Sequence, residues 1–170
     1  MKTLIALLRA VNVGGTGKLP MAELRSMAEA AGFADVRTYI QSGNLVFSTA
    51  DDPATVKEAL EKSLETYAGK FVGVIIRTGQ EMQAVLDANP FPNAEPSKVG
   101  VLFLDTSTSS TTVDEATGQA DEEIELGERE IFVHYPSGMG RTKLRLPSMS
   151  EGTVRNINTV ASLVKMSAGL

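Results

Sequence analysis

Four short polar stretches of the sequence carry side chains that could bind a ligand. The first follows an apolar run and combines two cations, one amide and three glycines, among them Arg9, Asn12, Gly14, Gly15 and Lys18. Glycines let backbone N–H groups approach an anion closely, and a helix N-terminus, which this loop enters, favours negative charge. The stretch could therefore bind a phosphate or carboxylate group, or it could simply be a tight connection with a solvated lysine.

A nucleotide-binding phosphate loop is excluded at this stretch. That motif needs a glycine five residues before its last glycine and a Ser or Thr directly after the lysine. Asn12 and Leu19 occupy these two positions. The hydroxyl that would bind magnesium is missing, so an anion site here would be of another kind.

The second stretch joins two expected strands and carries three neutral hydrogen-bonding side chains, Gln41, Ser42 and Asn44. Ser, Gly and Asn are ordinary turn residues, but Gln is not, so a binding role stays open beside plain turn formation. Regular pairing is expected to place this turn at the end of the sheet opposite the glycine-rich loop. The two stretches would then be separated.

The third stretch, residues 134–143, follows a strand and contains two glycines, hydroxyls and two cations. Its lone histidine, His134, has no obvious Ser–Asp partnership and is expected to be a half-buried structural residue. Arg141 and Lys143 are the better candidates, because cationic donors form strong hydrogen bonds with phosphate and carboxylate.

The fourth stretch, residues 153–158, precedes the last expected helix. Thr153 could cap that helix and would place Arg155 and Asn156 in its first turn. A cation in a first turn opposes the helix dipole unless an anion lies nearby. Arg155 and Asn156 are therefore candidate ligand contacts, with a solvated arginine as the alternative.

Hydrophobic periodicity and helix-end signals predict the elements that hold these stretches. The first half reads as strands at 2–8, 36–40, 45–48 and 70–77, with helices beginning at Pro20 and at Asp52-Pro53. This β-α-β-β-α-β order predicts a ferredoxin-like α+β subdomain over residues 1–77. The second half, residues 78–170, reads as a related but partial α+β subdomain. Its expected elements are a capped helix from Thr78, a strand at 99–104, a short helix at 112–119, a hairpin of 123–126 with 130–135, and a helix at 158–166.

The composition suits a soluble α+β protein and excludes several classes of site. The 170 residues include no cysteine and one histidine, so thiol chemistry and a histidine-rich metal centre are excluded, and no metal is expected. The net charge of −5 argues against a nonspecific nucleic-acid coat protein. The acidic segment 114–130 is expected to be a solvated face. The apolar N-terminal run is too short for a signal peptide or a membrane span, so a cytoplasmic protein is expected.

These stretches together resemble a bacterial domain-of-unknown-function family, number 1697, nearly end to end. The resemblance rests on LLRAVNVGG at 7–15, Pro20-Met21 with Leu24, TYIQSGN at 38–44, YPSG at 135–138 with Lys143, and TVRNINTV at 153–160. It implies a protein of two ferredoxin-like α+β subdomains. It implies no established activity, and the cofactor is left open.

The leading hypothesis is a polar, locally cationic cleft that binds an anionic small molecule or a nucleic-acid end. Arg9, Lys18, Lys143 and Arg155 would contact phosphate or carboxylate, while amide side chains would set orientation. One alternative is a hydrolase or transferase acting on a phosphate-bearing substrate. The other is a structural interaction module in which the polar stretches form buried hydrogen bonds. The oligomeric state is left open.

Overall fold

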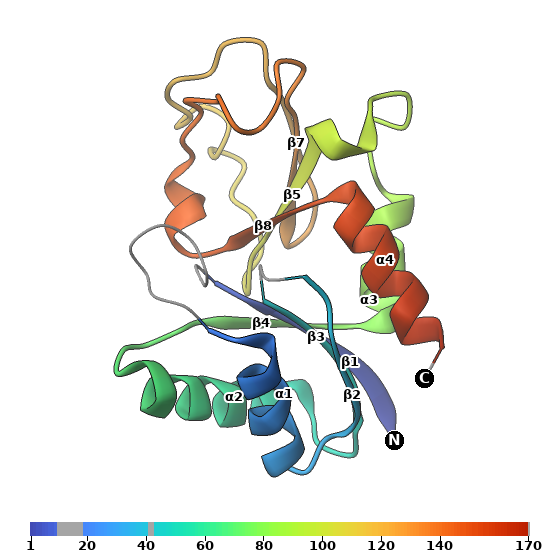
Figure 1. Cartoon of the computed structure of the whole chain (residues 1–170). Helices are drawn as coiled ribbons and strands as arrows, with labels where there is room; N and C mark the ends of the chain where they lie inside the picture. The colour runs from blue at the N-terminus through green and yellow to red at the C-terminus, as the bar shows by residue number, and fades with distance from the viewer. Residues whose placement is uncertain (10–18, 41–42, 170) are drawn as a thin grey trace. The chain divides into compact units, whose positions relative to one another are not determined.

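The computed structural model describes residues 1–9, 19–40 and 43–169, which form two compact units (Figure 1). The first unit consists of Met1–Met82 together with Leu163–Leu170, and the second unit consists of Gln83–Ser162. The expected division into residues 1–77 and 78–170 stays a prediction.

The first unit is built on a four-stranded antiparallel sheet with the strand order β2-β3-β1-β4. Its elements are β1 Lys2–Leu8, α1 Met21–Ala30, β2 Ala34–Thr38, β3 Asn44–Thr49, α2 Pro53–Ala68 and β4 Val74–Thr78. This is the ferredoxin-like arrangement, and it confirms the fold expected for the first half. The edge strands β2 and β4 are shifted by a few residues from their expected ranges.

Local signals fix the ends of the two helices. Asp52 caps α2 by accepting a hydrogen bond from the Thr55 N–H at 2.8 Å, and Gly69 ends it at φ 72° in the left-handed region. Pro20 has an extended backbone and precedes α1. The helix therefore begins at Met21, one residue after the start at Pro20 that the sequence predicted.

One face of the first sheet forms the core with both helices. Leu4, Ala6 and Leu8 alternate along β1 and pack with buried side chains of α1 and α2. Phe33 and Phe47 stack in this core with ring centroids 4.5 Å apart. Figure 1 shows the two helices side by side on this face of the sheet.

The β2–β3 turn lies at the same end of the sheet as the end of β1. Leu7 pairs with Asn44, and the Leu8 N–H donates to the Gly43 carbonyl at 2.9 Å. The expectation that this turn lies at the end of the sheet opposite the end of β1 was wrong, while the glycine-rich loop itself lies outside the described residues. The crossover through α1 makes β2 run in the same direction as β1, so both strands end at one edge.

The second unit is built on another antiparallel sheet, with the order β6-β7-β5-β8. The elements of the second half are α3 Gly79–Asp87, η1 Pro96–Lys98, β5 Val99–Phe103, β6 Glu123–Leu126, β7 Glu130–His134, η2 Pro147–Ser150, β8 Thr153–Asn156 and α4 Ile157–Ala168. Both α3 and α4 run across the boundary between the units.

The short helix expected at 112–119 does not form. Residues 112–115 of this segment are turn, and Thr117 pairs with Arg145 through two backbone hydrogen bonds of 2.9 and 2.8 Å. A helix of two turns is marginal without packing. The extended pairing with residue 145 therefore decides the local structure.

The segment expected to cap the last helix is instead the strand β8. Thr153 pairs with Phe103 and does not act as the helix cap. The cap is Asn156, whose Oδ1 accepts a hydrogen bond from the Thr159 N–H at 2.9 Å. The helix therefore begins after Asn156, and Arg155 lies in the strand.

Asn156→Ala is expected to destabilise the protein by about 1 kcal/mol, because the cap of α4 is lost. Thermal unfolding monitored by circular dichroism measures the change. Asn158→Ala is the matched control, since Asn158 is exposed in the first turn of the same helix and makes no side-chain hydrogen bond among the described residues. Equal melting temperatures for the two variants would contradict the capping role.

The two sheets share one strand order. In each sheet the order is second, third, first and fourth strand. Ile5 pairs with Arg77 in the first sheet, as Val101 pairs with Arg155 in the second. The fourth strand of each sheet leads directly into a helix. The related second half expected from the sequence is confirmed, with β8 as a strand that the sequence did not predict.

Candidate functional site

Arg9 lies at the end of β1, beside the segment that enters β4. Its backbone N–H donates to the Gly73 carbonyl at 2.9 Å. A Cβ on Gly73 would lie 2.9 Å from the Arg9 Cδ, so glycine at this position makes room for the arginine side chain. This explains the local course of the Arg9 side chain without a ligand.

Asn44 is fully buried at the start of β3, on the same edge of the sheet. Its Nδ2 donates to the Tyr39 carbonyl at 2.8 Å and so closes the turn. Within that turn Ile40 is half exposed at φ 47°, a strained conformation for a β-branched residue. The other candidates of these two stretches lie outside the described residues: Asn12, Gly14, Gly15, Lys18, Gln41 and Ser42.

The candidates of the fourth stretch have structural partners. Arg155 is only 5% exposed, and its guanidinium donates to the Thr153 hydroxyl at 2.6 Å and to the Val154 carbonyl at 2.9 Å. Burial lowers the pKa of Arg155 to about 10, so the side chain stays charged at neutral pH. Asn156 caps α4. Ligand contacts by Arg155 and Asn156 stay predictions.

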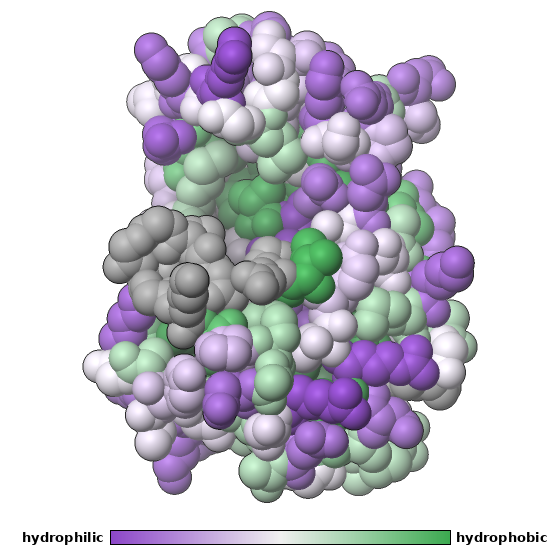
Figure 2. All heavy atoms as spheres, viewed as in Figure 1, coloured by the Kyte–Doolittle hydropathy of each residue, from purple (hydrophilic) through white to green (hydrophobic). Residues whose placement is uncertain are grey.

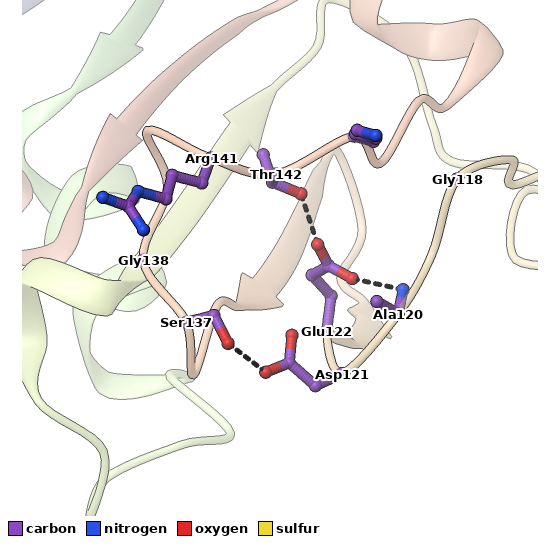
Figure 3. A pocket seen from close by; sticks show the side chains of 9 residues that line it. Gly118, Ala120, Asp121, Glu122, Ser137, Gly138, Arg141 and Thr142 are labelled. Carbon is purple, nitrogen blue, oxygen red and sulfur yellow. Dashed lines mark hydrogen bonds between the residues drawn. The ribbon is translucent and has the colours of Figure 1, made fainter.

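The remaining candidate, Lys143, lines a cavity of about 570 Å³ in the second unit (Figure 3). We call this cavity the connection pocket. Its lining residues are Gly118, Ala120, Asp121, Glu122, Ser137, Gly138, Arg141, Thr142 and Lys143. The volume lies within the range of about 300–1,000 Å³ that is typical of small-molecule sites.

The pocket is formed by the two connections that replace helices in the second unit. One wall comes from the β5–β6 connection, which corresponds to α1, and the other comes from the β7–β8 connection, which corresponds to α2. These connections cover the sheet face of Leu102 and Leu104, the counterparts of Ala6 and Leu8. Irregular connections thus take the place of a helix layer and leave a hollow between them.

Hydrogen bonds across the pocket tie its two walls together (Figure 3). Glu122 accepts a hydrogen bond from the Thr142 hydroxyl with one carboxylate oxygen and one from the Ala120 N–H, at 2.6 Å, with the other. Asp121 accepts a hydrogen bond from the Ser137 hydroxyl at 2.5 Å. The bond from Thr142, followed by that from Ala120, lowers the pKa of Glu122. Glu122 is therefore ionised at neutral pH.

Glu122→Gln is expected to lower stability at pH 7, and this difference should shrink in acid. A carboxyl whose folded-state pKa is depressed stabilises the fold above its ordinary value of 4.5, and this contribution is lost as the pH falls through the lower folded-state value. Melting temperatures of both proteins between pH 7 and pH 3 measure the effect.

The control for this titration is Glu125→Gln, because Glu125 is exposed on β6 and makes no side-chain bond among the described residues. A difference between wild type and Glu122→Gln that stays constant down to pH 3 would contradict the role of the ionised carboxylate.

The two cations of the pocket have no side-chain partner among the described residues. Within the described ranges, neither the Arg141 guanidinium nor the Lys143 ammonium has a hydrogen bond or ion pair. Both side chains are exposed, and Figure 3 shows the Arg141 side chain extending toward Gly138. Figure 2 shows hydrophilic side chains along the upper margin, where Figure 1 places the β7–β8 connection.

Lys143 is fixed to the opposite wall through its backbone. Gly118 has φ +70°, and a Cβ there would lie only 2.1 Å from the Lys143 carbonyl oxygen. The paired Thr117 and Arg145 hold the two chains together beside this contact. Close backbone approach therefore positions the base of the lysine side chain.

His134 lies in a smaller hollow of the second unit, with Glu123 and Phe91. Its Nδ1 is 3.2 Å from a Glu123 carboxylate oxygen, and its ring centroid is 5.5 Å from that of Phe91. The half-buried structural role expected for this histidine agrees with these contacts. No group of three or more His, Cys, Asp or Glu side chains in the described part of the chain could hold a metal ion.

The sequence indicated one wall of the pocket and missed the other. Arg141 and Lys143 were candidates because of their residue types. Asp121 and Glu122 belong to the acidic segment that was expected to be a solvated face, and nothing local distinguishes them from its other acids. Their partners Ser137 and Thr142 lie 16 and 20 residues away in the chain, so only the fold brings them together.

The fold and the pocket define an α+β protein with a repeated ferredoxin-like sheet, and sequence comparison places it in a family. The family described as "Protein of unknown function (DUF1697)" matches residues 1–132, and the chain belongs to it. The match includes the Gly118–Glu122 wall of the pocket and ends before the Ser137–Lys143 wall. The resemblance seen in the sequence motifs is thereby confirmed.

The chain is similar to a solved structure, that of the conserved bacterial protein SP0830 from Streptococcus pneumoniae. The two share 25% sequence identity and superpose with a TM-score of 0.81, over 98% of this chain and 98% of that chain. No curated protein matches the sequence. In the described residues, no helix has the length and apolar character needed to cross a membrane.

Proposed function

We propose that this protein binds a small anionic ligand, bearing a phosphate or carboxylate group, in the connection pocket. One observation carries the proposal. Arg141 and Lys143 line a pocket of ligand size and, among the described residues, lack protein partners. Cations at such a position are available to an anion.

The acidic side chains of the pocket have hydroxyl groups, and not these cations, as their side-chain partners in the described chain. Asp121 and Glu122 accept hydrogen bonds from Ser137 and Thr142, and within the described residues no ion pair joins them to Arg141 or Lys143. A planar guanidinium can bind a phosphate or carboxylate through two parallel hydrogen bonds, while an ammonium acts as a point charge.

A small molecule fits these features better than a nucleic acid. The volume of about 570 Å³ suits a ligand of metabolite size. The chain as a whole has a net charge of −5, which would repel an extended polyanion. Ligand contacts by the other expected cations, Arg9, Lys18 and Arg155, stay separate proposals and are not part of the connection pocket.

Isothermal titration calorimetry with inorganic pyrophosphate tests this proposal. Arg141→Ala and Lys143→Ala should each weaken binding by about tenfold or more, because a hydrogen bond to a charged group contributes about 1.5–3 kcal/mol. Lys62→Ala is the matched control, since Lys62 is exposed on α2 and the substitution removes the same charge. Binding should also weaken as salt is added.

Two results would contradict the proposal. One is the absence of pyrophosphate binding by the wild-type protein. The other is equal loss of affinity in Lys143→Ala and Lys62→Ala, which would assign binding to net charge and not to the pocket.

A further inference from the structure

In the part of the chain that the structure describes, the connection pocket has one carboxylate oxygen and two cations without partners. The Oδ2 of Asp121 accepts the hydrogen bond from Ser137. Among the described residues, its Oδ1 has no partner. Both carboxylate oxygens of Glu122 are occupied, by Thr142 and by the Ala120 N–H. Asp121 is thus the acid of the pocket that keeps one carboxylate oxygen without a partner in the described chain.

The acidic side chains of the pocket are hydrogen-bonded to hydroxyl groups of the facing wall. Asp121 and Glu122 are bound to Ser137 and Thr142, and in the described chain neither forms an ion pair with the cations of the same pocket. Figure 3 shows both carboxylates directed at the facing wall, toward these hydroxyls. Charges of opposite sign that line one hollow without pairing are complementary to a ligand with its own separated charges.

We infer that the ligand of the connection pocket is zwitterionic, with a phosphate or carboxylate bound by Arg141 and Lys143 and an ammonium group bound by Asp121. This inference rests on the proposed anion site and adds the second charge. Glu122 positions the wall that carries Asp121, and its negative charge favours a cationic group in the pocket. A ligand with an anionic group alone would leave the Asp121 carboxylate facing it without compensation.

Two probes that differ only in the ammonium group test the inference. O-phosphoethanolamine and ethyl phosphate share the phosphate and the two-carbon chain. By calorimetry at pH 7, the wild-type protein is expected to bind O-phosphoethanolamine about tenfold more tightly than ethyl phosphate, the effect of one charged hydrogen bond. In Asp121→Asn this ratio should fall to about one, while ethyl phosphate binds as well as before or better.

Asp121→Asn keeps an oxygen for the Ser137 hydroxyl, so the walls should stay joined, and circular dichroism and the melting temperature check this. The matched control is Glu125→Gln, which removes the same charge from an exposed position outside the pocket. It should leave the preference for O-phosphoethanolamine unchanged.

The outcomes separate this inference from the proposed function. If both probes bind equally well and Arg141→Ala weakens both, the anion site stands and the zwitterion inference is overturned. A preference that Asp121→Asn retains also overturns the inference. If neither probe binds and pyrophosphate fails too, the proposed function falls with it.

Discussion

Gly118→Ala is expected to destabilise the second unit by about 3 kcal/mol or more, because a left-handed backbone is strained by any side chain and the new methyl group has no space. At φ +70° the Cβ would lie 2.1 Å from the Lys143 carbonyl oxygen. Relief would require the two walls of the connection pocket to separate. The backbone hydrogen bonds between Thr117 and Arg145 would then stretch or break.

Substitutions at two other glycines of the same unit separate the cost of backbone strain from the cost of the close contact. Gly138 has φ +92° but no atom within 4 Å of an added Cβ, so Gly138→Ala should show the backbone strain alone, about 1 kcal/mol. Gly140 has open space around its Cβ position and no positive φ, so Gly140→Ala should be nearly neutral. Urea unfolding of the three variants measures the series, and equal effects at 118 and 138 would show that the close contact is unimportant.

Phe47→Ala is expected to destabilise the first unit by about 3–5 kcal/mol, the usual loss when a buried aromatic side chain is truncated. Phe47 is fully buried on β3, in the core that the sheet forms with α1 and α2. It also stacks on Phe33 with an angle of 10° between the rings. Truncation would leave a cavity and remove this stacking contact at the same time.

Phe71→Ala is the control for Phe47→Ala, because Phe71 is 62% exposed just before β4. Its truncation should change stability by no more than about 0.5 kcal/mol. The double variant Phe33→Ala/Phe47→Ala should lose less than the sum of its single changes, since the rings share one contact. Additive losses in urea unfolding would argue against the stacked pair.

The elements of the first unit were largely predictable because their signals are local. Asp52 and Gly69 mark the ends of α2 in the sequence and perform those roles in the structure. Thr78 and Glu81 likewise form the expected capping box of α3, through hydrogen bonds of 2.8 and 3.0 Å. Each of these interactions links residues no more than a few positions apart, so the sequence alone can show them.

Other features depend on partners that are distant in the sequence. Thr153 and Val154 could begin a helix or form a strand, and pairing with β5 decides for the strand. The end of β1 and the β2–β3 turn lie at one edge of the first sheet because β2 runs in the same direction as β1. The sequence analysis had predicted opposite edges. Local propensity cannot supply such choices, because the deciding hydrogen bonds are non-local.

The candidate site likewise combines residues that the sequence could indicate with residues that only the fold brings together. Arg141 and Lys143 could be proposed from residue type, because cationic donors form strong hydrogen bonds with phosphate and carboxylate. Asp121 could not be separated from neighbouring acids, since its partner on the other wall is found only in the folded chain. Asn44 and Arg155 were chosen for polarity, and the structure gives both of them protein partners.

The repeated strand order means that one scaffold is covered in two ways within a single chain. One sheet is covered by two helices, while the other is covered by two connections that leave a hollow with charged walls between them. The residues that line the connection pocket lie outside the paired strands, so substitutions there can change the charge of its walls without altering strand pairing. This separation makes the two connections a practical place for redesign.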